Sequence, residues 1–165
     1  MATKTKSTKG RAIFPGSFDP MTLGHMDIVR RMSEIFEEVT VLVADSLKKN
    51  YFFTKEERVA LVKQSVADFP NVKVDQFRGL TINYAVQHGF EVIIRSLRGT
   101  NDWDVEATMA QANKKLAPEI ETLFVMTQPE YAHISSTLVK EIAANGGSLT
   151  EFVSPEVAKA ISAKL

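Results

Sequence analysis

Short apolar runs alternate with amphipathic stretches along almost the whole chain. Apolar and β-branched runs predict strands at Ala12–Phe14, Val39–Ala44, Val72–Phe77, Val92–Ser96 and Leu123–Thr127. Helical patterns predict helices at Leu23–Phe36, Lys55–Phe69, Leu80–His88, Trp103–Leu116, Ser136–Ala144 and Pro155–Ala163. Strands that alternate with helices form a parallel sheet, and nearly continuous apolar strands indicate that helices cover both faces. We therefore expect one doubly wound α/β domain with a five-stranded parallel sheet.

Local signals predict several helix ends. Thr54 and Glu57 have the spacing of a capping box, and Ser154 before Pro155 fits an N-cap followed by the first helical residue. The Asn-Gly-Gly sequence at 145–147 can take the left-handed conformation that ends a helix. These signals support two helix starts and one helix end.

The composition is that of an ordinary globular protein and excludes several classes. Of 165 residues, 44% are hydrophobic and 24% charged, which fits a single domain at 11–165 after a disordered polar leader at 1–10. Lys plus Arg and Asp plus Glu number 20 each. The chain therefore lacks the excess of basic residues that would indicate a nucleic-acid partner. The chain has no cysteine for disulfides or thiolate metal sites. No apolar run reaches the roughly 20 residues of a membrane helix, so we expect a cytoplasmic protein without a membrane partner.

Polar and charged side chains follow four of the predicted strands. They lie at 15–25, at 45–50, at Arg95–Arg98 and at Tyr131–Thr137. Ligands of open parallel sheets bind outside the carboxyl ends of the strands, so these segments should meet at one edge. Together they supply Lys, Arg, His and hydroxyl groups, which suit a polyphosphate. Unrelated surface charges are the alternative that position alone leaves open.

The loop after the first strand carries the most specific pattern. Gly16 allows close approach of the backbone, Ser17 offers a hydroxyl, and Thr22-x-Gly24-His25 places an imidazole where a helix opens. Free amides and the helix dipole favour anions there. The chain has neither GxxxxGKS/T nor GxGxxG, so no other phosphate-binding motif competes. The sequence therefore predicts a nucleotide site around His25.

Four segments carry a resemblance to a known family. GSFDPxTxGH near the start, with ISST opening a late helix, resembles the nucleotidyltransferase superfamily that has a T/HxGH motif. Within it, RAIFPGSFDPMTLGHMDIV, FTKEERVALV, VIIRSLRGTNDWDVE and ISSTLVKEIA are similar to bacterial phosphopantetheine adenylyltransferases, over nearly the whole chain from Arg11. The resemblance implies a Rossmann-like nucleotidyltransferase fold. It also implies transfer of the adenylyl group of ATP to 4′-phosphopantetheine, which gives dephospho-coenzyme A and pyrophosphate.

The same resemblance implies roles for particular residues. It makes His25 the catalytic residue, as a donor to the α-phosphate. The residues expected to bind 4′-phosphopantetheine are Ser17, Lys49, Thr81 and Arg95. The residues expected to bind ATP are Ser17, Phe18, His25, Ser96, Leu97, Arg98, Glu106, Tyr131, Ala132, His133, Ile134, Ser135, Ser136 and Thr137.

Cofactor and partners also follow from the resemblance. Magnesium is expected with ATP, held mainly by phosphate oxygens and water, and no protein metal site is expected. Coenzyme A is expected as a feedback inhibitor, and a homohexamer as the assembly.

Some residues also fit simpler interpretations. Glu106 fits an ordinary carboxylate on a helix face, and Lys49 fits a solvated lysine beside Lys48. His88 lies where a helical pattern ends and is interpreted as a helix-end residue. His133 has no claim on the chemistry beyond its place near the nucleotide segment.

Three residues depart from the family pattern, and these changes touch the acceptor arm more than the phosphates. Ser96 stands where glycine is common, Val105 replaces a frequent aromatic residue, and Thr81 occupies a position that is often larger and apolar. Two alternative functions stay open. One is another nucleotidyltransferase, acting on nicotinamide mononucleotide, a pantoate-like acid, or a sugar or glycerol phosphate. The other is a sensor that binds nucleotide without turning it over.

Overall fold

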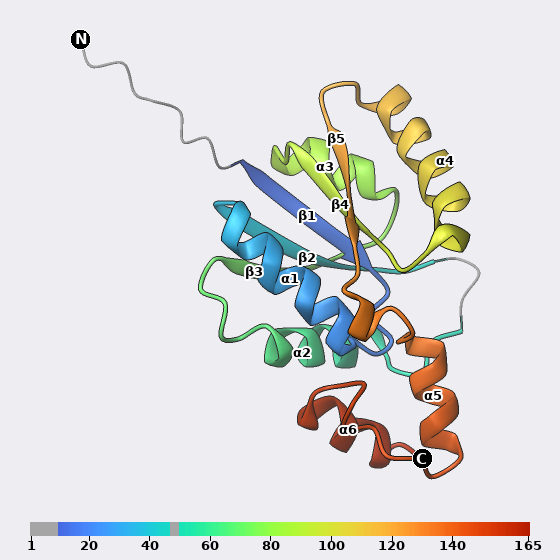
Figure 1. Ribbon diagram of the computed structural model, residues 1–165. Helices are drawn as coiled ribbons and strands as arrows, with labels where there is room; N and C mark the ends of the chain where they lie inside the picture. Colours follow the sequence, from blue (N-terminus) through green and yellow to red (C-terminus); the bar gives the residue numbers. More distant parts are fainter. Residues whose placement is uncertain (1–9, 47–49) are drawn as a thin grey trace.

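Five parallel strands form the centre of the molecule, in the spatial order β3-β2-β1-β4-β5 (Figure 1). The computed structural model describes residues 10–46 and 50–165. The strands are β1 (Arg11–Gly16), β2 (Glu38–Ala44), β3 (Val72–Phe77), β4 (Val92–Leu97) and β5 (Glu121–Met126). The helices are α1 (Leu23–Ile35), α2 (Lys55–Ser65), α3 (Thr81–His88), α4 (Thr100–Leu116), a 3-10 turn η1 (Pro129–Tyr131), α5 (Ser136–Ala144) and α6 (Pro155–Ser162). The predicted α/β fold with a five-stranded parallel sheet is confirmed.

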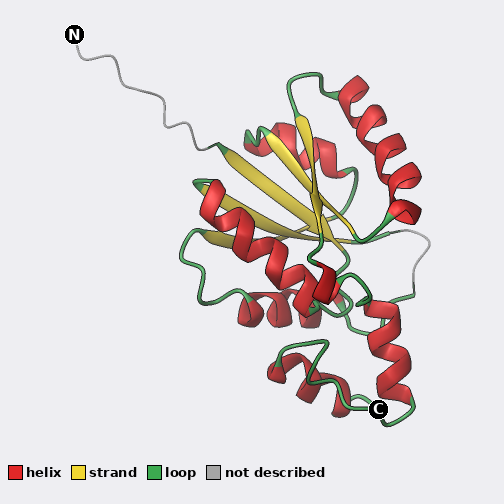
Figure 2. Ribbon diagram, in the orientation of Figure 1, coloured by secondary structure: helices red, strands yellow, loops and turns green. Residues whose placement is uncertain are grey.

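Helices pack on both faces of the sheet (Figure 2), and alternate residues of each central strand serve two cores. Phe14 of β1 and Ile94 of β4 belong to the core beneath α1 and α2. Ile13 and Ile93, one residue earlier on the same strands, belong to the core beneath α3. Successive side chains of a strand point to opposite faces, so a strand between two helical layers must be apolar throughout. This explains the continuous apolar runs in the sequence.

The strand order reverses direction between β1 and β4. The chain builds outward from β1 to β2 and β3, then returns to the other side of β1 with β4 and β5. A crevice opens where neighbouring connections leave in opposite directions, and ligands of such sheets bind there. The loops after β1 and β4 are therefore placed side by side at the carboxyl edge.

A third core joins α5 and α6 to α2. Phe53 and Leu61 pack with Val139 of α5 and Val157 of α6. Ser154 accepts a hydrogen bond from the Val157 N–H, as expected of the N-cap of α6. This packing fixes the start of α5 below the carboxyl edge of the sheet (Figure 1).

The predicted element ends differ from the structure at two informative places. Helix α2 ends at Ser65 and not at Phe69. Phe69 itself precedes Pro70, and a residue before proline is biased away from helical conformation. Helix α4 begins at Thr100, three residues before the predicted Trp103. The leader expected at 1–10 lies outside the described residues except for Gly10. No helix in the described part of the chain has the length and apolar character needed to cross a membrane.

Candidate active site

A cleft of about 300 Å³ lies at the carboxyl edge, where β1 and β4 diverge. It is bounded by the loop after β1, the end of β4, the first turns of α4 and the start of α5. Its lining residues are Phe14, Pro15, Gly16, Phe18, Thr22, Gly24, His25, Arg95, Ser96, Arg98, Asp102, Glu106, Thr127, Ile134, Ser135, Ser136 and Thr137. The structure therefore brings together residues from three of the four predicted segments. A second cavity of about 350 Å³ shares Phe18, His25, Ser136 and Thr137 with the cleft.

His25 is the third residue of α1 and is held by the N-cap residue Thr22. The Thr22 backbone N–H donates to His25 Nδ1 at 3.1 Å, so this nitrogen is unprotonated. In the neutral ring the proton is then on Nε2, which makes Nε2 a hydrogen-bond donor. Burial, and next the positive charges of Arg98 and Arg95, lower the pKa of His25 from 6.5 to about 4. His25 is thus a neutral donor near pH 7.

The low pKa of His25 should make the stability of the fold depend on pH. The unfolded chain protonates this side chain near pH 6.5 and the folded chain only near pH 4, so unfolding becomes easier as the pH falls between these values. We expect His25 to lower the free energy of unfolding by roughly 1–2 kcal/mol between pH 7 and pH 5. Urea unfolding at both pH values should show a smaller loss for His25→Gln. An equal loss in wild type and variant would contradict the lowered pKa.

Two arginines at the end of β4 lie beside the cleft, and a carboxylate of α4 holds each of them. Arg95 donates from Nε and Nη2 to Glu106 at 2.6 Å each, and from Nη1 to the Pro15 carbonyl at 3.0 Å. Arg98 donates from its backbone N–H, Nε and Nη2 to Asp102 at 3.0, 3.2 and 3.3 Å. Since Asp102 and Glu106 are one helical turn apart, one face of α4 orients both guanidinium groups.

The start of α5 supplies amides and hydroxyl groups on the opposite side of the cleft. Ser135 is the N-cap, and its side chain accepts from the Leu138 N–H at 3.0 Å. The Ser136 hydroxyl donates to the Pro20 carbonyl at 2.8 Å, which ties α5 to the loop after β1. The backbone N–H groups of Ser136 and Thr137 occupy the first turn, where a helix attracts anions. The hydroxyl of Ser136 is thus a structural tie, while the amides beside it suit phosphate oxygens.

Phe18 shapes the loop after β1. It adopts a φ of 48°, and its ring lies 5.2 Å from the His25 ring, centre to centre, in an edge-on contact. A Cβ atom at Gly16 would come within 2.9 Å of the Phe18 ring. Gly16 is therefore required by the Phe18 side chain, in addition to the close approach of backbone expected from the sequence.

Among the described residues, the other predicted site residues do not line the cleft. Ser17 lines the second cavity, Leu97 is buried in the sheet, and Thr81 is the first residue of α3. Within the segment 131–134 only Ile134 lines the cleft, and the ring of His133 packs edge-on against Phe152 at 6.1 Å. Tyr131 and Ala132 are half-buried beside it. Lys49 lies outside the described residues.

Several residues that line the two cavities were absent from the predicted site, and Asp102 and Lys140 are two charged examples. Asp102 escaped because the predicted helix began after it, although its spacing of four from both Arg98 and Glu106 is a helical signal. Lys140 lines the second cavity, and its Nζ lies 3.1 Å from Asp19 Oδ2. Its signal was the spacing of one turn from Ser136.

Among the described residues, no three His, Cys, Asp or Glu side chains gather in a way that could hold a metal ion. The two carboxylates that line the cleft, Asp102 and Glu106, are both engaged by arginines.

Comparisons with known proteins agree with this arrangement. The cytidylyltransferase-like family model matches residues 13–142. A crystal structure from Vibrio parahaemolyticus, provisionally assigned as a nicotinate-nucleotide adenylyltransferase, superposes with a TM-score of 0.67 at 20% identity, covering 93% of this chain and 98% of that one. The fold and a cleft lined by groups that bind anions thus define a nucleotidyltransferase.

Curated relatives narrow the assignment. Phosphopantetheine adenylyltransferase of Thermotoga neapolitana is 47% identical over 93% of this chain and 96% of its own length. The enzymes so named from Alkaliphilus metalliredigens and a Synechococcus strain are 49% and 51% identical, over 92% and 90% of this chain and 97% and 93% of their own lengths. The chain belongs to the phosphopantetheine adenylyltransferase family.

Proposed function

We propose that this chain transfers the adenylyl group of ATP to 4′-phosphopantetheine, giving dephospho-coenzyme A and pyrophosphate in coenzyme A biosynthesis. One observation carries the proposal within this family: His25, Arg95, Arg98 and the start of α5 converge on a single cleft. The nucleotidyltransferase domain occupies residues 11–165.

The chemistry requires positioning more than a nucleophile from the protein. A phosphate oxygen of the acceptor attacks the α-phosphorus of ATP, and the bond to the pyrophosphate oxygen breaks with its electron pair. The attacking group is already anionic near pH 7, so the protein must hold two repelling anions in line and neutralise the charge that develops. Cations and fixed N–H donors do this.

On the ATP side, the cleft supplies donors of two kinds. His25 donates from Nε2 to an α-phosphate oxygen, and Arg98 neutralises the phosphates that leave. The amides at the start of α5, Ser136 and Thr137, bind further phosphate oxygens. The segment 131–134 forms the wall against which the adenine rests.

On the acceptor side, Arg95 binds the phosphate of 4′-phosphopantetheine together with Lys49. Glu106 is better placed to orient Arg95 than to contact ATP, since its two oxygens accept from Arg95 at 2.6 Å each. An arriving phosphate therefore meets a guanidinium already fixed in orientation. Thr81 is retained as a contact to the pantetheine arm and Ser17 as a residue between the two substrates.

Lys49→Ala should raise the Michaelis constant for 4′-phosphopantetheine more than that for ATP. The reason is that the loss of one cation weakens the hold on a single phosphate, which belongs to the acceptor. Initial rates with each substrate varied in turn measure both constants. A defect confined to ATP would show that Lys49 has another role.

Pyrophosphate release across a panel of acceptors tests the function itself. We expect release with ATP plus 4′-phosphopantetheine, and none with nicotinamide mononucleotide, pantoate, or a sugar or glycerol phosphate. Release with one of those acceptors alone would indicate a different nucleotidyltransferase. ATP binding without release for any acceptor would indicate a nucleotide sensor.

Magnesium accompanies ATP in this proposal and is bound by phosphate oxygens and water. It would neutralise phosphate charge during the transfer. Excess EDTA should abolish pyrophosphate release, and added Mg²⁺ should restore it. Full activity in EDTA would exclude the ion.

The outer surface of α4 supports self-association, and the assembly in this proposal is a homohexamer. Val105, Met109 and Leu116 lie along one side of the helix and are exposed by 71%, 54% and 63%, and no α4 residue is buried. Exposed apolar groups of this kind mark contact surfaces. Light scattering should give six times the mass of one chain, and a monomer mass would contradict the assembly.

Coenzyme A contains the product of the proposed reaction, so its binding to the same cleft would restrain the enzyme. Inhibition by coenzyme A that weakens as 4′-phosphopantetheine is raised is the expected result. A cytoplasmic location, where ATP is available, is part of the same proposal.

A further inference from the structure

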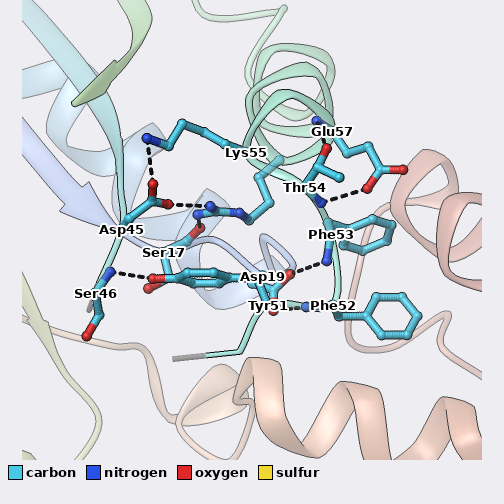
Figure 3. Close-up of polar contacts among 11 residues, drawn as sticks. Ser17, Asp19, Asp45, Ser46, Tyr51, Phe52, Phe53, Thr54, Lys55 and Glu57 are labelled. Carbon is cyan, nitrogen blue, oxygen red and sulfur yellow. Dashed lines mark hydrogen bonds and ion pairs between the residues drawn. The ribbon is translucent and has the colours of Figure 1, made fainter. Parts of the chain in front are cut away.

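Arg58 of α2 is a fully buried cation behind the loop that carries Phe18, with a side chain only 1% exposed. It donates from Nη2 to Asp45 Oδ1 at 2.5 Å and from Nη1 to the Ser17 carbonyl oxygen at 2.8 Å. Its guanidinium carbon lies 4.0 Å from the centre of the Tyr51 ring. Figure 3 shows Ser17, Asp45 and Tyr51 converging from different segments. Arg58 thus joins the loop after β1 to the chain that leaves β2.

The stability of the fold does not account for a cation at this position. The Nε of Arg58 is a buried donor that finds no hydrogen-bond partner among the described residues. A buried ion pair contributes little net stability, and an apolar pair of similar volume is often as stable. Only a planar guanidinium group can donate to a carboxylate and a carbonyl oxygen together while its flat face rests on an aromatic ring. Arginine is therefore needed for orientation.

The group that Arg58 orients is the peptide between Ser17 and Phe18. Since the C=O and N–H of a trans peptide point in opposite directions, holding the Ser17 carbonyl turns the Phe18 N–H away from Arg58. Phe18 lines both cavities of the site, and its N–H donates to no acceptor among the described residues. The φ of 48° at Phe18 is one that residues other than glycine seldom adopt, so the loop needs an external constraint to keep it.

We propose that Arg58 is a positioning residue for adenylyl transfer. It fixes the Ser17–Phe18 peptide so that the Phe18 N–H donates to the phosphates of the nucleotide, and it keeps the Phe18 ring against His25. The proposal rests on the function proposed above. It concerns a residue that touches no substrate and acts only through the loop.

The test compares two variants that disturb Asp45 in different ways. Arg58→Met/Asp45→Asn removes the guanidinium without leaving a buried charge unpaired. Lys55→Met is the matched control, since Lys55 Nζ binds Asp45 Oδ2 at 2.5 Å but makes no contact with Ser17 among those described. We expect the double variant to melt within about 5 °C of wild type while its kcat falls roughly a hundredfold, the loss typical of one preorganised donor. Lys55→Met should keep kcat within about twofold.

A kcat of the folded double variant within about twofold of wild type would overturn the proposal. If that variant does not fold, Arg58→Lys gives the same answer, because an ammonium lacks both the rigid planar donor spacing that spans Asp45 and the Ser17 carbonyl and the flat face that rests on the Tyr51 ring. A hundredfold fall then supports the proposal, and an unchanged kcat overturns it.

The Phe18 amide resonance separates this proposal from the proposed function. It should shift on addition of α,β-methylene ATP in wild type and much less in the double variant. If the two proteins differ in this shift but the wild type releases no pyrophosphate, the proposed function is wrong and the role of Arg58 in the loop stands. Equal shifts in both proteins would overturn the role of Arg58.

Discussion

Replacing His25 by alanine should lower kcat by roughly a hundredfold to a thousandfold, while the affinity for ATP changes much less. The reason is that a neutral Nε2–H aimed at the α-phosphate is most useful when negative charge has gathered there. Thr22 fixes this tautomer through its hydrogen bond to Nδ1 at 3.1 Å. Pyrophosphate release gives kcat, and calorimetry with ATP alone gives the affinity.

His88→Gln is the matched control for this experiment. His88 lies at the end of α3, where its ring stacks on Tyr84 at 4.0 Å, and it lines neither cavity. Its activity should stay near that of wild type. Equal losses of kcat and ATP affinity in His25→Ala would instead identify His25 as a ground-state ligand or a structural residue.

Replacing Arg95 together with its partner should have the second largest effect. We expect Arg95→Met/Glu106→Gln to lower kcat/KM for 4′-phosphopantetheine by roughly 30- to 150-fold, because charge-assisted hydrogen bonds to one phosphate contribute about 2–3 kcal/mol. Changing both residues avoids an unpaired carboxylate, since the Glu106 side chain is only 16% exposed. The Michaelis constant for ATP should change far less. Steady-state rates with each substrate varied in turn provide the measurement.

Arg98→Met/Asp102→Asn is the corresponding double variant on the ATP side. Arg98 and Asp102 form the second pair along the same face of α4, and the proposed partner of Arg98 is ATP. This variant should therefore raise the Michaelis constant for ATP more than that for the acceptor. The same defect in both double variants would contradict the assignment of one arginine to each substrate.

The sequence predicted the elements well because their signals are local. The apolar runs placed all five strands, and the capping box of Thr54 and Glu57 marked the start of α2 correctly. The start of α4 was missed because Gly99 caps it without a side-chain hydrogen bond, which leaves no capping residue to recognise. That error of three residues also concealed Asp102.

Which charged side chains pair with one another could not be predicted from the sequence, for a different reason. Arg95 and Glu106 meet because β4 and α4 lie side by side, and Arg58 meets Ser17 across 41 positions of the chain. Neither contact leaves a periodic or local trace. The sequence assigned Glu106 to the nucleotide side and did not single out Arg58.

What the sequence determined by itself was the order of strands and helices and the clustering of anion-binding groups after the strands. Hydrophobic period and helix caps depend on residues a few positions apart, so one chain suffices to see them. Only the tertiary structure decided that His25 is neutral, that each cleft arginine has its own carboxylate, and that Arg58 is buried. Desolvation and charge pairing depend on distances between distant segments, which exist only once the sheet has formed.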